Sequence, residues 1–329
     1  MYISFSAGFF LFALLSGTIL SISSDSWFGA WCGLELNLMA FIPFVSMSSN
    51  QYSSEASLKY FLIQALGSAF IILGAIMYSY MIHFLSIMSI ALLLKLGAAP
   101  FHFWFPQVME GMDWSQCIIL MTVQKMAPMY LLSYIVLSSN SIIMFYSAII
   151  SAVVGGVGGV NQTFLRKLLA FSSINHMSWM LFAMFMSETS WLLYFLFYSL
   201  ISISVVFLFY SHQAYYLSQL MSVNQPILSM LGFLSLLSLG GLPPFTGFIP
   251  KWIIIQEMVF QKLFFILLLL LLMTLLTLYY YLRLTIVFMN ILSFKTKSNL
   301  KDFILVNKIP LFMVINFLGL TFPSLFMLI

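Results

Sequence analysis

Four ionisable residues occur within long apolar stretches of the sequence, where a charge is costly. Glu35, Lys95 and Lys125 fall near the centres of three stretches. Lys251 follows a Gly/Pro-rich break in another stretch. On insertion scales a central charged residue costs about 2.5–3.5 kcal/mol, so four cost on the order of 10 kcal/mol unless they meet partners or water. We therefore interpret these residues as a proton relay.

A purely structural role for the same residues is the alternative. Glu35 would then form a static salt bridge with one lysine, while backbone carbonyls at helix breaks cap the others. Three lysines and one carboxylate cannot all pair, however. Burial also disfavours the charged form of lysine, which leaves the amine able to accept and release a proton. This imbalance favours the relay.

Two histidines are further candidates for the relay. His102 follows Pro100, and His176 lies near the centre of another apolar stretch. Histidine titrates near neutral pH, although a hydrogen-bonded structural histidine explains either position equally well. Other polar side chains in these stretches could hold linking water molecules or simply bond to backbone carbonyls: Thr122, Ser172, Ser173 and Asn175.

The remaining charges favour less specific roles. Lys59 and Arg283 are expected near span ends, where long side chains reach the membrane interface. Glu257 is a weaker candidate for a secondary site. The other acidic residues are predicted in loops: Asp25, Glu55, Glu110, Asp113, Glu188 and Asp302.

The composition identifies the membrane as the solvent for nearly all of the 329 residues. Sixty-three per cent are apolar and 6% are charged, whereas an ordinary soluble domain has about 25% charged residues. No basic cluster of the nucleic-acid-binding type occurs, despite the net charge of +4. Cys32 and Cys117 form no CxxC or Cys/His pattern, and nucleotide-binding motifs are absent from the sequence. We expect no cofactor or metal in this chain.

Polar and turn-like breaks divide the chain into eleven expected membrane helices. A helix needs roughly 20 residues to cross the hydrocarbon core. The first stretch has no basic segment or cleavage site and is expected to be retained as a span. The spans are 3–22, 26–47, 58–80, 83–105, 114–138, 141–160, 164–186, 190–211, 226–259, 263–289 and 308–328.

Glycine and proline indicate where these helices are interrupted. A straight helix over 226–259 would be about 51 Å long, more than the membrane core needs. Its segment 240–247 (GGLPPFTG) therefore predicts two half-helices joined by unwound backbone. Residues 97–100 (GAAP) and Ala127-Pro128 predict smaller interruptions, while Gly155 and Gly159 have the GxxxG spacing of close helix packing.

The two Gly/Pro breaks with a nearby lysine occur five spans apart, which suggests an internal repeat. An odd number of spans places the copies in opposite orientations. We expect one polytopic all-α membrane domain over 1–329, with repeats 1–138 and 141–289 followed by a loop and final helix over 290–329. The cation bias predicts an N-terminus on the matrix or cytoplasmic side and a C-terminus outside. Lys262 alone opposes the cations on the N-terminal side: Arg166, Lys167, Lys295, Lys297, Lys301 and Lys308.

Several segments resemble the mitochondrial NADH–ubiquinone oxidoreductase chain 2 family. They are 92–104 (LLLKLGAAPFHFW), 124–128 (QKMAP) and 238–252 (SLGGLPPFTGFIPKW), with 33–37 (GLELN), 55–61 (EASLKYF) and 172–176 (SSINH). The resemblance covers most of the chain, but little after Arg283. It implies an antiporter-like membrane-arm subunit of respiratory complex I in the mitochondrial inner membrane, beside other subunits and lipid. The C-terminus would face the intermembrane space.

The resemblance also implies how the four candidates divide the work. Glu35 and Lys95 match the family's switchable pair, Lys125 its central lysine and Lys251 the lysine of its second broken helix. Other subunits would bind NADH, FMN, iron–sulfur clusters and ubiquinone. Electron transfer in those subunits would be coupled to proton pumping through this chain. Bacterial members carry additional N-terminal helices. A stand-alone cation/proton antiporter and a scaffold of the arm are the alternatives.

Overall fold

The computed structural model describes residues 5–48, 50–78, 85–138, 142–220 and 226–292. Every regular element in these ranges is a helix, beside one isolated bridge between Phe164 and Tyr216. Seven described helical segments are long and apolar enough to cross a membrane: 6–23, 27–46, 51–78, 114–136, 165–186, 188–212 and 264–288. Shorter apolar helices cover 85–96, 142–158 and 230–240. The all-α membrane class is therefore confirmed, while the expected span 308–328 lies outside the described residues.

The chain forms two compact units, residues 1–151 and 152–329. Unit 1 contains α1 (Phe5–Ser23), α2 (Trp27–Ser46), α3 (Gln51–Tyr78), α4 (Leu85–Leu96), α5 (Trp104–Gly111), α6 (Trp114–Met121) and α7 (Val123–Ser138). The helix α8 (Ile142–Gly158) runs across the boundary. Unit 2 contains α9 (Leu165–Met186), α10 (Glu188–His212), α11 (Leu217–Leu220), α12 (Pro226–Gly240), α13 (Phe248–Phe260) and α14 (Phe264–Leu292).

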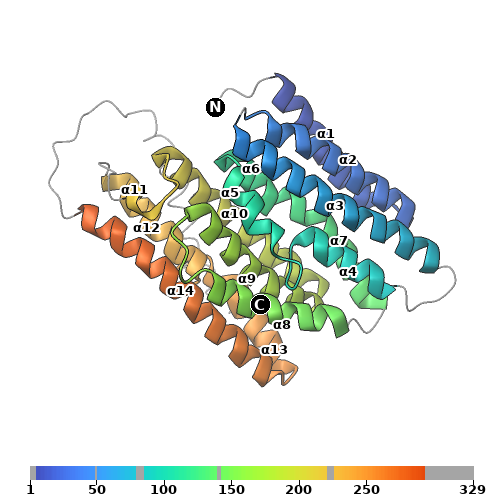
Figure 1. Ribbon diagram of the computed structural model, residues 1–329. Helices are drawn as coiled ribbons and strands as arrows, with labels where there is room; N and C mark the ends of the chain where they lie inside the picture. Colours follow the sequence, from blue (N-terminus) through green and yellow to red (C-terminus); the bar gives the residue numbers. More distant parts are fainter. Residues whose placement is uncertain (1–4, 49, 79–84, 139–141, 221–225, 293–329) are drawn as a thin grey trace. The chain divides into compact units, whose positions relative to one another are not determined.

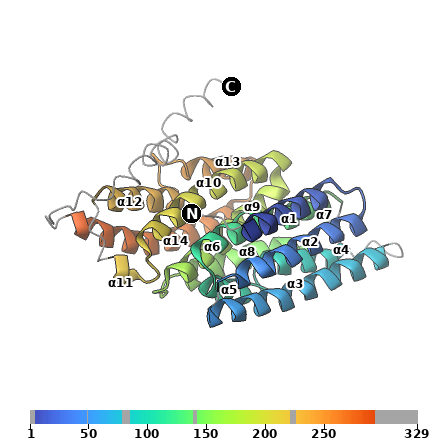
Figure 2. The ribbon, with the colours of Figure 1, turned by 90° about the horizontal axis from the view of Figure 1, so that it is seen from above.

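In unit 1, α1, α2 and α3 lie side by side, and α3 continues the contact to α4 (Figures 1 and 2). Glycines permit the close approach of α1 to α2. A Cβ added at Gly17 would lie 2.9 Å from the backbone nitrogen of Asn37, and one at Gly33 would lie 2.5 Å from that of Ser21. Larger side chains at Gly17 and Gly33 would force α1 and α2 apart. The two glycines therefore hold α2, which carries Glu35, close to α1.

The predicted interruption at 97–100 is confirmed, and its cap has a recognisable geometry. Gly97 has a φ of 71° and donates its N–H to the Leu94 carbonyl at 3.1 Å, while Ala98 donates to Leu93 at 3.1 Å. These two bonds form a Schellman motif, which satisfies carbonyls at the end of α4. A helix resumes at Trp104.

The predicted interruption at Ala127-Pro128 is wrong in position. Pro128 lies inside α7, and the discontinuity falls earlier, at Thr122, whose φ and ψ are −112° and −80°. Proline lacks an N–H and its ring crowds the carbonyl of the residue four positions before it, here Gln124. The interruption of this span lies at Thr122, six residues before the proline and outside the turn on which the proline acts, and α7 continues beyond Pro128.

The glycines of α8 confirm the predicted packing role. In unit 2, a Cβ at Gly155 would lie 2.5 Å from the Asn175 nitrogen, and one at Gly159 would lie 2.6 Å from the Tyr280 ring. These contacts bring α8 against α9 and α14. Arg283 of α14 donates to the Val160 carbonyl at 3.0 Å and to the Gln162 carbonyl at 2.6 Å, in the segment between α8 and α9.

The ninth predicted span is divided as expected, into α12 and α13. Gly241 has a φ of 76°, and its N–H donates to the Ser238 carbonyl at 3.0 Å. Leu242 donates to Leu237 at 3.4 Å. Both broken helices thus end in the same kind of cap, and each cap places a glycine in the left-handed region.

Helix α3 begins earlier than the sequence suggested, which corrects the environment of two charges. Glu55, expected in a loop, lies in α3 with Lys59, and their side chains form an ion pair of 2.6 Å. They are one helical turn apart and largely exposed, so the pair contributes about 0–1 kcal/mol. Glu110 and Glu188, also expected in loops, lie in α5 and α10.

Candidate functional site

Lys95 lies in the last turn of α4, directly before the first break, and is 6% exposed. The absence of a side chain at Gly67 on α3 makes room for it, since a Cβ there would lie 2.9 Å from Lys95 Cγ. The Lys95 carbonyl accepts a hydrogen bond from Gln64 Nε2 at 3.1 Å, and the Leu94 carbonyl accepts one from Trp104 Nε1 at 3.1 Å. Helix-end carbonyls otherwise lack partners, so these side chains stabilise the broken end that carries the lysine.

Glu35 is half-buried on α2 and interacts electrostatically with Lys95. Both residues are described, and they do not form an ion pair within 4.0 Å. The structure therefore brings the expected pair together without the static salt bridge of the structural alternative. A carboxylate at this range favours the protonated amine, and the effect depends on their separation. The pair can respond to a displacement of either helix.

Lys125 lies just after the discontinuity at Thr122 and is 2% exposed. Its backbone N–H donates to the Thr122 carbonyl at 3.1 Å. Its Nζ lies 4.9 Å from the centroid of the Phe105 ring, within the range of a cation–π interaction. Phe105 follows the Trp104 that caps the end of α4, so the same short segment contacts both lysine environments.

Three further polar side chains belong to this region and were not identified from the sequence. Gln124 Nε2 donates to Asn37 Oδ1 at 2.8 Å, and the Tyr60 hydroxyl donates to Gln124 Oε1 at 3.1 Å. Asn37 and Tyr60 are 3% and 2% exposed. None of the three is ionisable in the ordinary pH range, so none carries the charge that singles out Glu35 and the lysines in the sequence. Amides inside apolar stretches carry a similar signal, and including them would have selected Gln64 and Gln124.

In unit 2, Lys251 lies in the first turn of α13 and is 6% exposed. Its Nζ donates to the Gly240 carbonyl at 2.8 Å, at the end of α12. A Cβ at Gly241 would lie 2.9 Å from this Nζ, so the second break is shaped around the lysine as well. This carbonyl cap is the arrangement that the structural alternative predicted for a lysine, and it holds Lys251 at the unwound segment.

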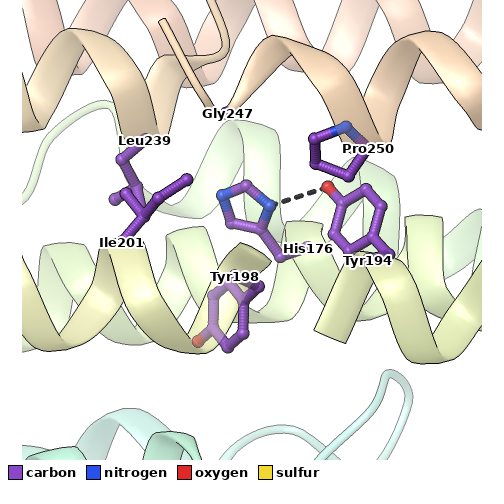
Figure 3. A pocket seen from close by; sticks show the side chains of 7 residues that line it. All are labelled: His176, Tyr194, Tyr198, Ile201, Leu239, Gly247 and Pro250. Carbon is purple, nitrogen blue, oxygen red and sulfur yellow. Dashed lines mark hydrogen bonds between the residues drawn. The ribbon is translucent and has the colours of Figure 1, made fainter. Parts of the chain in front are cut away.

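His176 lines a small pocket beside the second break (Figure 3). Its Nδ1 lies 2.8 Å from the Tyr194 hydroxyl, and its ring centroid lies 5.1 Å from that of Tyr198. The pocket is completed by Ile201, Leu239, Gly247 and Pro250. The space open to the centre of a water molecule is about 10 Å³, which is about what one ordered water needs. Pro250 precedes Lys251, so the pocket adjoins the segment that carries the lysine.

The hydroxyls proposed as water holders bond to the backbone of their own helices. Thr122 Oγ1 donates to the Ile118 carbonyl at 2.6 Å, Ser172 Oγ to Leu169 at 2.8 Å and Ser173 Oγ to Ala170 at 2.7 Å. This is the simpler of the two interpretations offered for them, and it leaves their donors occupied.

His102 and Glu257 stay secondary candidates. His102 is half-buried in the first break, where its ring packs against Phe103 with centroids 4.2 Å apart. Glu257 Oε1 accepts a hydrogen bond of 3.1 Å from Ser187 Oγ, and Ser187 caps α10 by accepting from the Ser190 N–H. A cap explains Glu257 without a part in proton transfer, and a relay role for His102 stays a prediction.

The sequence matches the family described as NADH:quinone oxidoreductase/Mrp antiporter over residues 24–83 and 77–277. The class defined by this match is an antiporter-like membrane protein. Among curated relatives, NADH-ubiquinone oxidoreductase chain 2 of Anopheles gambiae is 45% identical and covers 84% of each chain. The Locusta migratoria protein of the same name is 39% identical and covers 97% of this chain and 96% of the relative. The chain belongs to the NADH-ubiquinone oxidoreductase chain 2 family.

Solved structures share the fold at lower identity. A chain of respiratory complex I from Thermus thermophilus is 23% identical with a TM-score of 0.83, covering 97% of this chain and 79% of that chain. A chain of the Mrp complex from Dietzia is 17% identical with a TM-score of 0.77, covering 84% and 59%. These likenesses extend the fold to both classes of complex.

Proposed function

We propose that this chain is a proton-translocating membrane-arm subunit of NADH:ubiquinone oxidoreductase. The observation that carries the proposal is the position of Lys95, which is buried at the end of an interrupted helix in space left by Gly67 and forms no ion pair within 4.0 Å with Glu35. When Glu35 approaches, the protonated form of Lys95 is favoured, and when it withdraws, release of the proton is favoured. Electron transfer elsewhere in the complex would set this separation.

The remaining candidates would carry the proton onward. Lys125, buried after a helix discontinuity, would act as the central relay group, and Lys251 would act at the second break. His176 could exchange a proton through the water-sized pocket that it shares with Tyr194. Histidine is suited to this role because it titrates near neutral pH. Unwound backbone leaves carbonyl groups free to bind a lysine and commonly lines a cavity, whereas the carbonyls of an unbroken helix are already bonded.

The wider setting follows from the family. The relatives' name assigns them to NADH-ubiquinone oxidoreductase, so the partners of this chain are other membrane-arm subunits and lipid. The chain is a multi-pass protein of the mitochondrial inner membrane. We propose that its N-terminus faces the matrix and its C-terminus the intermembrane space, from the cation bias of the loops. NADH, FMN, iron–sulfur clusters and ubiquinone are proposed to be bound by other subunits.

Replacement of Lys95 tests the proposal. We expect Lys95→Met in an assembled complex, reconstituted in vesicles, to lower the number of protons pumped per NADH oxidised. Lys59→Met is the matched control, since it removes a lysine from an exposed surface pair and is expected to pump normally. Full pumping by an assembled Lys95→Met complex would refute the relay, and loss of assembly and activity together would favour a scaffold.

A stand-alone cation/proton antiporter is the second candidate, because the Mrp chain shares the fold. An imposed sodium or potassium gradient would then drive proton movement in the same vesicles without NADH. We expect no such movement. Proton flux that follows the cation gradient and is lost in Lys95→Met would favour the antiporter.

A further inference from the structure

A chain of polar side chains joins three helices of unit 1; Asn37 and Tyr60 are buried in it, and Gln124 is half-buried. Asn37 of α2, Gln124 of α7 and Tyr60 of α3 form it, through hydrogen bonds of 2.8 Å and 3.1 Å that both involve the Gln124 amide. The bonded partners are 87 and 64 residues apart in the sequence. Gln124 therefore holds α2 and α3 to α7 at a single point.

Each of these helices carries a residue of the relay, or its support, close to this point. Asn37 follows Glu35 by two residues on α2, and Gln124 directly precedes Lys125 on α7. One turn after Tyr60, the helix α3 bears the Gln64 whose amide binds the backbone of α4. The Gln124 amide is thus bonded to α2, which carries Glu35, and to α3, which supports the end of α4, and it is adjacent to the central lysine.

The aromatic contacts make a second link between the same places. The Tyr60 and Trp104 rings meet edge to face with centroids 5.9 Å apart, and Trp104 caps the end of α4. The next residue, Phe105, faces the Lys125 ammonium. Tyr60 therefore contacts the break in α4 through its ring and contacts α7 through its hydroxyl.

Packing alone does not require an amide at this position. Helices in a membrane associate through close apolar packing, and a buried polar group whose partner is lost is costly there. A glutamine amide offers two donors and two acceptors, so it can exchange partners when its neighbours move. An element with alternative bonding arrangements is what coupling between two sites needs.

We propose that Gln124 is a positioning residue that couples the Glu35–Lys95 pair to Lys125. The inference rests on the proposed function. Because Asn37 lies about 3 Å from Glu35 along the axis of α2, a displacement that changes the separation of Glu35 from Lys95 carries Asn37 with it. The Asn37–Gln124 bond transmits this displacement to α7, beside Lys125. The charged pair and the central lysine then change state together.

The test replaces Gln124 with methionine, which has a similar length and cannot make either bond. In the assembled complex in vesicles, we expect Gln124→Met to slow proton pumping relative to NADH oxidation about thirtyfold, the effect on an equilibrium of losing two ordinary hydrogen bonds of about 1 kcal/mol each. Gln107→Met is the matched control, because Gln107 is an exposed glutamine of α5 in the same unit. It is expected to pump normally.

A second variant separates positioning from simple stabilisation. Gln124→Glu retains a donor and an acceptor while its carboxyl is protonated and loses the donor when it ionises. We expect its pumping to approach that of the unmodified complex at acidic pH and to fall as the pH rises, a dependence that the control lacks. Gln116→Met provides a purely structural comparison, since Gln116 binds the Phe44 and Val45 carbonyls at 3.0 Å and 3.2 Å. It is expected to reduce assembly without a change in the pH profile.

The outcomes distinguish this inference from the proposed function. If Lys125→Met lowers pumping but assembled Gln124→Met pumps like Gln107→Met, the coupling role is overturned and the relay stands. If Lys125→Met also pumps fully, the relay itself fails. If Gln124→Met does not assemble, a Gln124→Glu complex with an unchanged pH profile overturns the coupling, and loss of assembly in both variants assigns Gln124 a structural role instead.

Discussion

Gly67 is the position at which α3 makes room for the Lys95 side chain, and its replacement by alanine perturbs the lysine without removing it. The added Cβ would lie 2.9 Å from Lys95 Cγ, 3.3 Å from Leu94 Cδ2 and 3.4 Å from Lys95 Cε. The nearest contact is too close for two carbon atoms, so the flexible lysine stem must shift. Because the stem is fixed to α4 at its other end, the ammonium moves relative to Glu35.

The effect of Gly67→Ala on stability is the balance of two opposing contributions. Alanine is favoured over glycine in a helix by about 1 kcal/mol, whereas an extra methyl group in a packed interior costs about 1–3 kcal/mol. The net change in stability therefore lies between roughly zero and 2 kcal/mol destabilising. A change of about 1 kcal/mol in the Glu35–Lys95 interaction would alter the protonation equilibrium of the lysine roughly fivefold. The effect on proton transfer should thus exceed the effect on assembly.

Gly74 provides the control for this substitution. It lies on the same helix, and a Cβ added there would contact the side chain of Met88 on α4, which carries no charge. Gly74→Ala therefore introduces a packing change between the same two helices that is at least as severe, since its Cβ would lie closer to Met88 Cγ than the Cβ added at Gly67 lies to its nearest neighbour. We expect both complexes to assemble, as measured on native gels, and only Gly67→Ala to pump fewer protons per NADH. Equal pumping by the two assembled variants would refute the assignment of Lys95 to the relay.

Three further predictions concern the breaks and the pocket. Gly241→Ala places a side chain in the left-handed region, which costs about 1–2 kcal/mol, so we expect a lower thermal denaturation temperature. Gly240→Ala is the control and should leave this temperature nearly unchanged, because its Cβ would make only an ordinary contact of 3.6 Å. Gln64→Leu leaves a buried helix-end carbonyl without its 3.1 Å partner and should destabilise the complex by about 1–3 kcal/mol in the same assay. Tyr194→Phe removes the hydroxyl 2.8 Å from His176 Nδ1 and should displace the pH dependence of pumping; an unchanged profile would exclude that histidine from the relay.

The local features of the fold could be predicted from the sequence because their causes are local. The left-handed glycines at Gly97 and Gly241 end their helices within a few residues, and the breaks predicted at these two places are present. Pro128 shows the limit of this reasoning. The helix α7 accommodates this proline in its interior, and the discontinuity of the span lies six residues earlier, at Thr122.

The long-range contacts of the candidate site could not be predicted in the same way. The Gln124–Asn37 bond joins residues 87 positions apart, and no spacing rule relates them. Whether Glu35 forms an ion pair could not be predicted either, because the charge of a carboxylate is known from the sequence but its distance from Lys95 is not. Arg283 likewise binds carbonyls more than 100 residues away, which no spacing rule predicts.

The sequence by itself determined the solvent, the helical class and the cost of each buried charge, because hydrophobicity, backbone freedom and charge are properties of single residues and short segments. Only the tertiary structure decided which of the costly residues meet. It placed Glu35 close enough to interact with Lys95 without an ion pair, and it bonded Lys251 to the carbonyl at the end of a broken helix. It also connected α2, α3 and α7 through Gln124. These relations depend on how helices far apart in the chain pack together, and small residues such as Gly67 set that packing.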